Sequence, residues 1–404
     1  MDVLFLSPAY PLEMQQFSRG LAEVGARVFG VGDSDPRGMP SPLKSYLADY
    51  LQVPSILDEE DVFRRVMSWG RRFDRIEANW EPVTLLAARL REAMGIPGMS
   101  VDTVVGFRDK VVMRDRVAAA GLRIPRTVRV ASREQAWKAS EEVGFPLILK
   151  PVDGAGSADT WKVSSKEDLD GILARLGHRA EASCEEFIEG TEYTYETICV
   201  NGRPAYESVC VYAPNALDAR KNEWISPIIQ SIRDLDDPRV RDGIALGRSV
   251  LSALGMGTGF THMEWFRTPK GEAVFGEIAC RAPGACMVDL MNYTGDIDLF
   301  REWARAVCWG DVRAPARRPY SAAIVFKRAQ GNGRISDIRG LQAFRQRFGG
   351  QIAREDWLPI GSPRRDWHQT FLSDGHVVVR HPDERVTRQI AEIAAAELCV
   401  LAHG

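Results

Sequence analysis

The chain has 404 residues, of which 45% are apolar and 26% are charged. This length predicts about two to three domains, and the composition excludes a disordered or collagen-like chain. The 52 basic and 55 acidic residues leave a net charge of −3, which argues against nucleic acid as a partner, because a phosphate-binding surface needs a basic excess.

The cysteines and the start of the chain indicate the compartment. The seven cysteines form no CxxC pair, so we expect neither a disulfide framework nor a zinc site, and a reducing cytoplasm fits best. The first residues, MDVLFLSPAYP, carry Asp2 where a secretory signal has a basic residue, and the apolar run ends at Pro8. No later apolar stretch reaches the length of a membrane span. We therefore expect no membrane partner.

The first hundred residues alternate short apolar runs with amphipathic segments, a pattern typical of βαβ units in a parallel sheet. Asp58 precedes three acidic residues, which predicts the N-cap of a helix. The pattern indicates a small doubly wound α/β domain over residues 1–104, although SPAYPLEM replaces the GxGxxG of a dinucleotide site. Glycines that follow amphipathic segments mark the predicted helix ends, and they are Gly25, Gly95, Gly121 and Gly144.

Beyond residue 104 the pattern is that of an α+β domain. A basic helix, RDKVVMRDRVAAAG, precedes a predicted strand at residues 145–150 and longer strands through Tyr212. After Gly310 a linker-like segment, VRAPARRP, precedes an alternating strand at residues 321–327 and a final helix at residues 384–401. We expect an α+β domain over residues 105–312, with a lid at about 123–190, and a C-terminal αβ domain over 313–404. That last part carries 15 basic and 9 acidic residues.

The segment PLILKPVDGAGSAD joins a strand ending in Lys150 to a turn that contains Gly154, Gly156 and Ser157. The backbone N–H groups of such a turn can surround phosphate oxygens, and the lysine adds a positive charge. The spacing is not that of a Walker A motif. An ordinary hairpin turn beside a surface lysine explains this segment equally well.

Two further segments have a nucleotide-binding and a simpler interpretation. Lys110 lies in the first turn of a predicted helix, where a cation is unfavourable unless an anion lies nearby, but a solvated helix face explains it too. In CEEFIEGTEYTYET, Glu185 to Ile188 can form a strand-like hinge that pairs with a base edge, and the Glu192 carboxylate suits two ribose hydroxyls. A solubilising acidic edge is the alternative for that segment.

The segment THMEWFRTPKGEAVFGEIACR predicts a β-hairpin with its turn at TPKG. With the turn centred between Lys270 and Gly271, Glu264 and Glu277 face each other about 5 Å apart at Cβ. Such carboxylates repel unless a cation lies between them, and oxygen ligands suit Mg²⁺. An acid pair that shares a proton and a solvent-facing pair are the alternatives. Arg281 follows closely, where it can meet developing negative charge.

Taken in chain order, Lys110, Lys150 with its glycine-rich turn, EEFIEGTEY, HMEW and GEIACRAPG resemble the ATP-grasp superfamily. The similarity is greatest to its carboxylate–amine ligases, which include the D-alanine–D-alanine and L-amino-acid ligases, and it extends over essentially the whole chain. It implies an ATP-grasp fold, ATP, one or two Mg²⁺ ions with Mn²⁺ as an alternative, small-molecule carboxylate and amine substrates, and a homodimer.

The resemblance also implies roles for individual residues. It makes Arg281 and Lys150 catalytic and Glu264 and Glu277 metal ligands. The implied ATP contacts are Lys110, Lys150, Gly154, Gly156, Ser157, the adenine hinge of Glu185, Glu186 and Ile188, and the ribose acceptor Glu192. One position departs from the family pattern, because Ala279 stands where a metal-binding asparagine is usual, although some members carry alanine there.

Three weaker expectations concern the substrates. The loop of residues 213–227, with Arg220 and Lys221, could close over the γ-phosphate, or could be a floppy basic loop. His262 shares a face with Glu264 and orients a ligand, or is a packed structural histidine. Residues 282–285, including Gly284, are expected to open a helix whose N–H groups hold a carboxylate.

The implied reaction has two steps. A substrate carboxylate attacks the γ-phosphate of ATP to give an acyl phosphate, and an amine then displaces phosphate to form an amide. Two alternatives remain. One is a carboxylase or formate-dependent enzyme of the purine-synthesis type, for which the basic C-terminal domain would supply a phosphate pocket. The other is a non-catalytic ATP-binding regulatory module.

Overall fold

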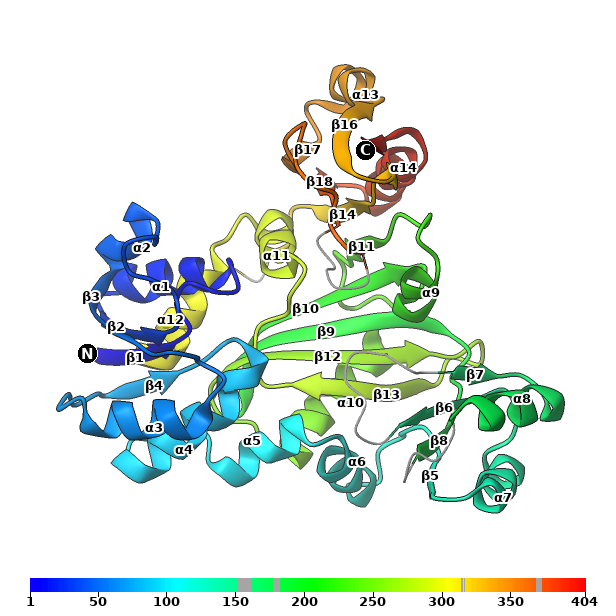
Figure 1. The fold of residues 1–404 in the computed structure, drawn as a ribbon, viewed down its shortest axis with the longest axis horizontal. Helices are drawn as coiled ribbons and strands as arrows, with labels where there is room; N and C mark the ends of the chain where they lie inside the picture. Colours follow the sequence, from blue (N-terminus) through cyan, green and yellow to red (C-terminus); the bar gives the residue numbers. More distant parts are fainter. Residues whose placement is uncertain (152–160, 177–181, 314, 316, 368–372) are drawn as a thin grey trace.

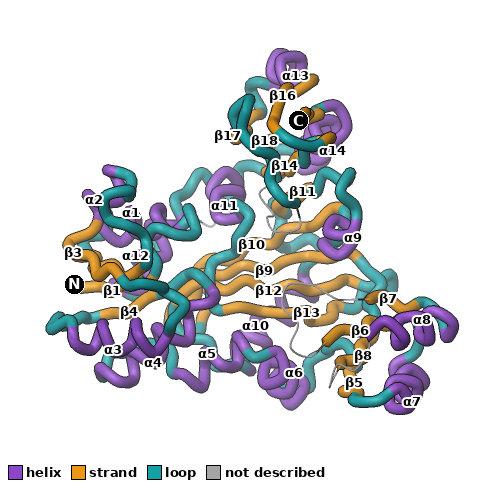
Figure 2. Tube along the Cα trace, in the orientation of Figure 1, coloured by secondary structure: helices purple, strands orange, loops and turns teal. Residues whose placement is uncertain are grey.

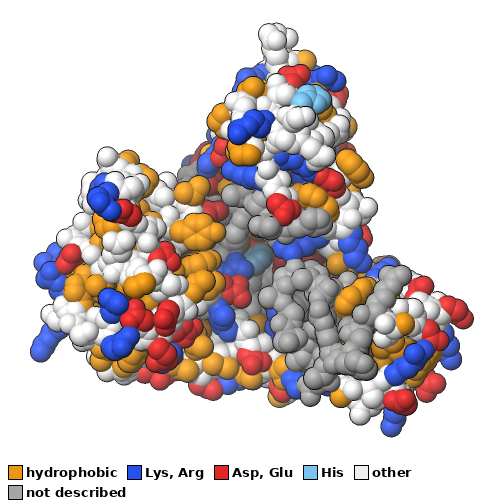
Figure 3. All heavy atoms as spheres, viewed as in Figure 1, with side chains coloured by type: hydrophobic (Ala, Val, Ile, Leu, Met, Phe, Trp, Pro, Cys, Tyr) orange, Lys and Arg blue, Asp and Glu red, His pale blue; other side chains and the backbone are white. Residues whose placement is uncertain are grey.

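The computed structural model describes residues 1–404 except 152–160, 177–181, 314, 316 and 368–372. Figure 1 shows an N-terminal lobe, a lid and a C-terminal lobe arranged around a long central sheet. Figure 2 shows that helices flank this sheet while the C-terminal lobe projects from one of its edges. In the space-filling view of Figure 3, acidic and basic side chains are interspersed over the N-terminal lobe, in keeping with the small net charge.

The N-terminal lobe is built on a parallel sheet in the order β3-β2-β1-β4, which confirms the expected doubly wound α/β lobe. Asp58 caps α3 by accepting a hydrogen bond from the Asp61 N–H, and the four glycines after predicted helices all have positive φ. The strands are β1 (Asp2–Leu6), β2 (Arg27–Gly32), β3 (Leu47–Gln52) and β4 (Arg75–Glu77). The helices are α1 (Met14–Glu23), α2 (Ser41–Tyr46), α3 (Glu59–Ser68), η1 (Glu81–Val83), α4 (Thr84–Met94) and α5 (Val101–Arg108).

A helix from much later in the chain completes the core of this lobe. Helix α12 (Leu299–Trp309) lies along α1, where Trp303 packs edge-on against Phe17 with ring centroids 5.0 Å apart. Arg19 of α1 also forms a bidentate ion pair with Asp298, at 2.8 and 3.1 Å. The N-terminal lobe is therefore anchored to the rest of the molecule through its own core.

The central sheet has eight strands in the order β13-β12-β9-β10-β11-β14-β18-β17. Helix α10 (Arg241–Ala253) packs against β13 and β12. The strands are β9 (Thr191–Val200), β10 (Arg203–Ala213), β11 (Ile228–Ser231), β12 (Gly259–Arg267), β13 (Ala273–Ala279), β14 (Ser321–Lys327), β17 (Ile352–Trp357) and β18 (Gly375–His381). The last three extend the same sheet, so the C-terminal lobe is joined to the body by backbone hydrogen bonds.

Strand β14 is buried along its whole length instead of on alternate residues as predicted. Helix α14 (Glu384–Glu397) covers one face of the strand, and α11 (Met287–Gly295) covers the other. Burial on both faces gives a continuous apolar run, which is the pattern of an internal strand.

The lid is a second four-stranded sheet in the order β5-β8-β6-β7. Helix α6 (Lys110–Ala119) leads into it, with Asp109 as N-cap. The strands are β5 (Thr127–Val130), β6 (Leu147–Pro151), β7 (Trp161–Val163) and β8 (Ala182–Glu186), and the helices are α7 (Arg133–Val143) and α8 (Lys166–Leu176).

The C-terminal lobe ends in a small sheet in the order β15-β19-β16. The prediction of a helix over residues 384–401 is wrong at its end, because α14 stops at Glu397 and β19 (Cys399–His403) follows. Val400 and Ala402 of β19 are buried against Ile335, which draws this segment into the sheet. The other elements are β15 (Gln330–Gly331), β16 (Arg334–Arg339) and α13 (Leu341–Phe348).

The mixed α/β and α+β class expected from the sequence is confirmed by these sheets. All seven cysteines are free thiols. In the described part of the chain, every helix is too short or too polar to cross a lipid bilayer.

Candidate active site

The hairpin of β12 and β13 places Glu264 directly opposite Glu277, as the sequence predicts, but for a different reason. From Arg267 paired with Ala273 up to Trp265 paired with Phe275, the register is centred on Lys270. That register alone would put Glu264 opposite Gly276. A β-bulge at Gly276 adds one residue to β13 and moves Glu277 into place.

Gly276 is required at this bulge by the close approach of the neighbouring backbone. A Cβ atom built on Gly276 would lie 2.8 Å from the carbonyl oxygen of Glu264, closer than a carbon and an oxygen can pack. The opposition of the two carboxylates therefore depends on a residue without a side chain.

Both facing carboxylates are held by cationic side chains. The Nζ atom of Lys110 lies 2.8 Å from Oε2 of Glu277, and Nε2 of His262 lies 3.7 Å from Oε1 of Glu264. The other ring nitrogen of His262, Nδ1, lies 2.9 Å from Oε1 of the fully buried Glu196. Burial alone would lower the pKa of His262, but its contacts with Glu196 and Glu264 raise the pKa to about 9, so the ring is an imidazolium at neutral pH.

This donor set fits a hard divalent cation. Burial disfavours the ionised form of Glu264, yet His262, Arg281 and Lys110 hold the pKa of its carboxyl below the usual value. Two facing carboxylates that already attract positive side chains are the oxygen ligands that Mg²⁺ prefers. Among the described residues, no group of three or more His, Cys, Asp or Glu side chains could hold a metal ion. Phosphate oxygens and water would therefore have to complete the coordination of an ion at Glu264 and Glu277.

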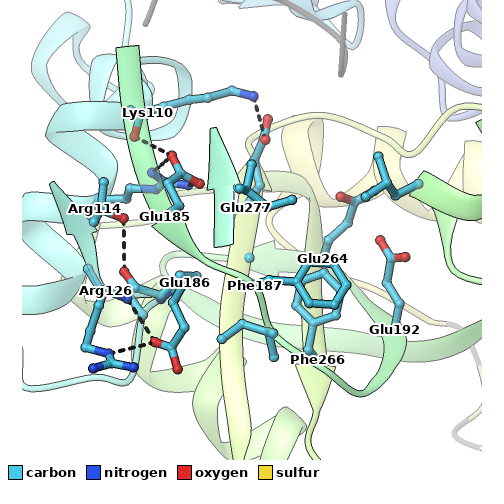
Figure 4. Close-up of a pocket in the computed structure, with 18 of the residues that line it drawn as sticks. Lys110, Arg114, Arg126, Glu185, Glu186, Phe187, Glu192, Glu264, Phe266 and Glu277 are labelled. Atoms are coloured by element: carbon cyan, nitrogen blue, oxygen red, sulfur yellow. Dashed lines mark hydrogen bonds and ion pairs between the residues drawn. The ribbon is translucent and has the colours of Figure 1, made fainter. Parts of the chain in front are cut away.

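A cavity of about 850 Å³ lies beside the hairpin, between the lid sheet and the central sheet. Ile124, Ile148, Phe187 and Phe266 give it apolar walls that suit a flat base. Figure 4 shows Phe187, Phe266, Glu192 and Glu264 among the side chains that line this cavity. The cavity brings together seven residues predicted from the sequence, namely Lys110, Glu185, Glu186, Ile188, Glu192, Glu264 and Glu277.

Glu192, the expected ribose acceptor, is buried at the start of β9. Its Oε2 accepts a hydrogen bond of 2.7 Å from the Ala216 N–H, and its own N–H donates to Oδ1 of Asn215. Burial and the nearby Glu264 raise the pKa of the Glu192 carboxyl to about 8. The side chain therefore carries a proton at neutral pH before a ligand binds, and it can both donate and accept a hydrogen bond.

The expected adenine hinge is fastened by arginines that the sequence analysis did not identify. Arg114 of α6 binds both carboxylate oxygens of the buried Glu185, at 2.9 Å to Oε2, and Ser183 donates to the same group. Arg123 holds Glu186 at 2.8 Å. A signal for Arg114 was present, because Lys110 and Arg114 are four residues apart and so share a helix face, as Figure 4 shows.

Arg281 does not line the cavity. It pairs instead with Glu81, its Nε and a terminal nitrogen each lying 3.0 Å from Oε2. Glu81 follows Trp80 beyond the carboxyl end of β4, next to β1, where the winding of the parallel sheet reverses direction. Such a switch point is the usual place for a ligand in an open α/β sheet. No local pattern could reveal this pair, because 200 residues separate its members.

The remaining predicted residues are not among those that line the cavity. Arg220 and Lys221 end α9 (Ala216–Lys221), and Glu264 partly offsets the lowering of the Arg220 pKa by burial. Residues 282–285 do not open a helix as predicted, since α11 begins only at Met287. The reason is that Ala285 and Cys286 adopt left-handed conformations, with φ of 53° and 56°, which are incompatible with a helix. Gly284 precedes this turn.

The glycine-rich turn falls in a segment that is not part of the described structure. Gly154, Gly156 and Ser157 lie outside the described residues, and so does the side chain of Lys150. The backbone of Lys150 lies in β6, paired with Ser183 of β8. The expected phosphate contacts of this segment stay predictions.

Comparison with known proteins gives relatives in both sequence and structure. No family model matches the chain. The L-arginine-specific L-amino acid ligase of Bacillus subtilis is 25% identical over 274 residues, covering 65% of each chain. The alanine–anticapsin ligase of the same species is 26% identical over 276 residues, covering 62% of this chain and 58% of that one. The alignments thus span less than two thirds of either relative.

The solved structure of an L-amino acid ligase from Bacillus licheniformis superimposes with a TM-score of 0.79 over 100% of this chain and 99% of that one, at 18% identity. The chain has the ATP-grasp fold. The cavity lies between the two antiparallel sheets of this fold. Glu81 of the N-terminal lobe pairs with Arg281, which follows β13.

Proposed function

We propose that this protein is an ATP-dependent carboxylate–amine ligase that forms an amide bond and releases ADP and phosphate. The observation that carries the proposal is the cavity in which a buried ribose acceptor candidate, Glu192, lies next to the facing carboxylates of Glu264 and Glu277, with Lys110 beside them. The ligases that match the chain in sequence support the same reaction class.

The nucleotide would enter with its base between the apolar walls and its ribose at Glu192. The protonated carboxyl of Glu192 can donate to one ribose hydroxyl and accept from another. The phosphates would then extend toward Lys110, which can exchange its partner Glu277 for phosphate oxygens when a metal neutralises that carboxylate. Lys150 and the turn with Gly154, Gly156 and Ser157 are proposed to complete the phosphate site.

Glu264 and Glu277 are the residues that would hold Mg²⁺, in one or two ions. The bound metal neutralises phosphate charge and makes the γ-phosphorus more electrophilic. Ala279, whose side chain offers no ligand, follows Glu277 by two residues on β13, so the second ion would depend on Glu277. His262, held by Glu196, keeps the carboxylate of Glu264 oriented and ionised.

The chemistry then takes two displacements. A substrate carboxylate oxygen bonds to the γ-phosphorus while the bond to the bridging oxygen breaks, and ADP leaves with that electron pair. The amine nitrogen next bonds to the acyl carbon, loses a proton and expels inorganic phosphate. Arg281 is proposed to contact the negative charge that develops in both steps. Glu81, its partner, holds the guanidinium in place until substrate binds.

The test is ADP and phosphate release from Mg-ATP across a panel of acids, each with and without amines, with mass detection of the product. One matched relative is named as specific for L-arginine and another as joining alanine to anticapsin, so arginine and alanine belong in the first panel. Amine-dependent ADP release with an amide product is expected. Release that depends on bicarbonate or formate would instead favour the purine-synthesis type, and nucleotide binding without turnover would favour a regulatory module.

Two aspects of the surroundings belong to the same proposal. Seven free thiols suit a reducing cytoplasm. Dimerisation of the chain follows only from the resemblance, and light scattering of the purified protein would test it.

A further inference from the structure

Helix α9 connects the nucleotide cavity to the C-terminal lobe. Asn215 to Asp218 line the cavity, and the N–H of Ala216 is bound by Glu192. The side chain of Asn215 fastens the same end, because its Nδ2 donates to the Gly190 carbonyl at 2.9 Å and its Oδ1 accepts from the Glu192 N–H at 3.1 Å. Figure 1 shows α9 between the central sheet and the lobe above it.

The other end of α9 is held by Arg328, which follows β14 in the C-terminal lobe. One terminal nitrogen of Arg328 donates to the carbonyls of Ala219 and Asn222, at 2.9 and 2.8 Å. These carbonyls belong to the last turn of α9 and the residue just after it, where intrahelical partners are missing and a cation is favourable.

Burying the Arg328 side chain at this position costs free energy. Its side chain is only 8% exposed, and its Nε has no hydrogen-bond partner. The guanidinium lies over the ring of Trp367, 4.7 Å from the centroid, and no carboxylate in the described parts of the chain forms an ion pair with it. Burying a guanidinium without a counter-ion costs several kcal/mol, so a purely space-filling role would be served better by an apolar side chain.

We propose that Arg328 is a positioning residue of the nucleotide site, acting through α9. By binding the end of α9, it keeps the opposite end against Glu192 and the cavity. This inference rests on the nucleotide site of the proposed function, but not on the ligase reaction. It gives the C-terminal lobe a role in a site to which it contributes none of the described lining residues.

The first measurement is calorimetric binding of Mg-ADP, which needs neither acid nor amine. We expect Arg328→Ala to weaken binding about tenfold while the thermal unfolding midpoint stays within a few degrees of the wild type. Added guanidinium ion should restore part of the affinity, since the substitution leaves a cavity of matching shape. Arg328→Lys keeps the charge but lacks the planar fork, so its affinity should fall between the two.

Arg233→Ala is the matched control. Arg233 also donates to two carbonyls, those of Arg318 and Pro382, at 2.8 and 2.7 Å, but it has no contact with α9 in the described structure. It should leave Mg-ADP affinity unchanged. Wild-type affinity in Arg328→Ala, or an equal loss in both variants, would overturn the proposal.

A double-mutant cycle that does not use the alanine variant tests the proposal even if Arg328→Ala fails to fold. Asn215→Asp removes the donor to Gly190 at the far end of α9, and Arg328→Lys perturbs the near end with little change of volume. If both act through α9, the double variant should bind Mg-ADP no more weakly than the poorer single variant. Additive losses would contradict the proposal. If no variant, and not even the wild type, bound Mg-ADP, the nucleotide site itself would be wrong.

Discussion

At the scale of single residues, each of the two facing carboxylates is paired with a cationic side chain. Lys110 holds Glu277 and His262 holds Glu264, so each of these two carboxylates has a positive charge beside it before a ligand binds. Glu192 differs, because burial and the nearby Glu264 raise the pKa of its carboxyl to about 8, and the backbone N–H of Ala216 and the charge of His262 offset this only in part. Binding of a metal would release Lys110 for phosphate.

Glu277→Gln tests this arrangement directly. We expect Mg-dependent turnover to fall at least about a hundredfold, because the amide loses the charge that attracts both Mg²⁺ and Lys110. The far-ultraviolet dichroism and the unfolding midpoint should not change. Glu272→Gln is the control, since Glu272 lies near the turn of the same hairpin, half exposed and paired with Arg123. Equal activity in the two variants would remove Glu277 from the metal site.

His376 provides a residue-scale prediction on stability. It is buried in β18, and burial lowers its pKa from 6.5 to about 4 against the opposing charge of Asp356, while Arg354 and Arg365 lower it further. At His376 the folded protein thus binds fewer protons than the unfolded chain between pH 4 and 6.5, so the stability that this residue contributes is fully present above pH 6.5 and falls as pH drops through this window. The loss should reach about 3 kcal/mol.

Urea unfolding of wild type and His376→Phe at several pH values measures that loss. The difference in unfolding free energy between the two proteins should change in favour of the variant as pH falls from 6.5 toward 4. Carboxyl groups titrate in both proteins, so their effect on the unfolding free energy cancels in this difference. A difference that does not depend on pH would show that His376 is readily protonated in the fold.

At the scale of elements, a single inserted residue sets the geometry of the site. The register of the hairpin alone puts Glu264 opposite Gly276, and the bulge puts it opposite Glu277. The bulge also needs a backbone approach that only glycine allows, because a Cβ at this position would lie 2.8 Å from the Glu264 carbonyl oxygen. The pairing of two carboxylates is thus a property of β12 and β13 together.

Gly276→Ala should separate the two carboxylates without removing either. We expect at least a tenfold rise in the Mg²⁺ concentration needed for half-maximal turnover, and a loss of stability of about 1–3 kcal/mol from overpacking. The measurement is a magnesium titration of activity beside a urea denaturation curve. Gly350→Ala is the control, because a Cβ there meets nothing within 4 Å. An unchanged magnesium requirement would mean that the bulge does not position the ligands.

At the scale of the whole molecule, the lobes are joined by secondary structure rather than by linkers. Strand β14 pairs with β11 in the central sheet, with Ile229 opposite Ile324. Helix α12 sits in the core of the N-terminal lobe. The domain boundaries expected at residues 104 and 313 stay predictions. In the structure, the lobes on either side of each position share a hydrophobic core or a β-sheet.

Truncation after residue 312 tests this continuity. The shortened chain would expose the edge of β11 and the apolar face formed by residues such as Ile228 and Ile229. We expect it to aggregate or to lose its cooperative unfolding transition, as seen by size-exclusion chromatography and calorimetry. Removal of only residues 403–404, at the end of β19, should be tolerated. A soluble monomeric fragment with the melting transition of the full chain would show that the C-terminal lobe is an independent unit.

The sequence by itself determined what depends on neighbours along the chain. Periodic apolar residues and capping signals such as Asp58 predicted most helices and strands of the N-terminal lobe. The hairpin segment predicted that Glu264 faces Glu277. The order of Lys110, Glu192, Glu264 and Glu277 indicated the fold. The caps and the hairpin act over a few residues, so local sequence carries them, whereas the order of the four site residues indicated the fold through its resemblance to a known family.

Only the tertiary structure decided the contacts between distant segments. Arg114 with Glu185, Arg281 with Glu81 and Arg328 with α9 each join parts of the chain separated by 71 to 200 residues. The bulge at Gly276 and the late strand β19 were missed because both depend on the surface against which the segment packs. A sequence pattern indicates which residues are buried or paired, but which partner each residue contacts depends on the tertiary fold.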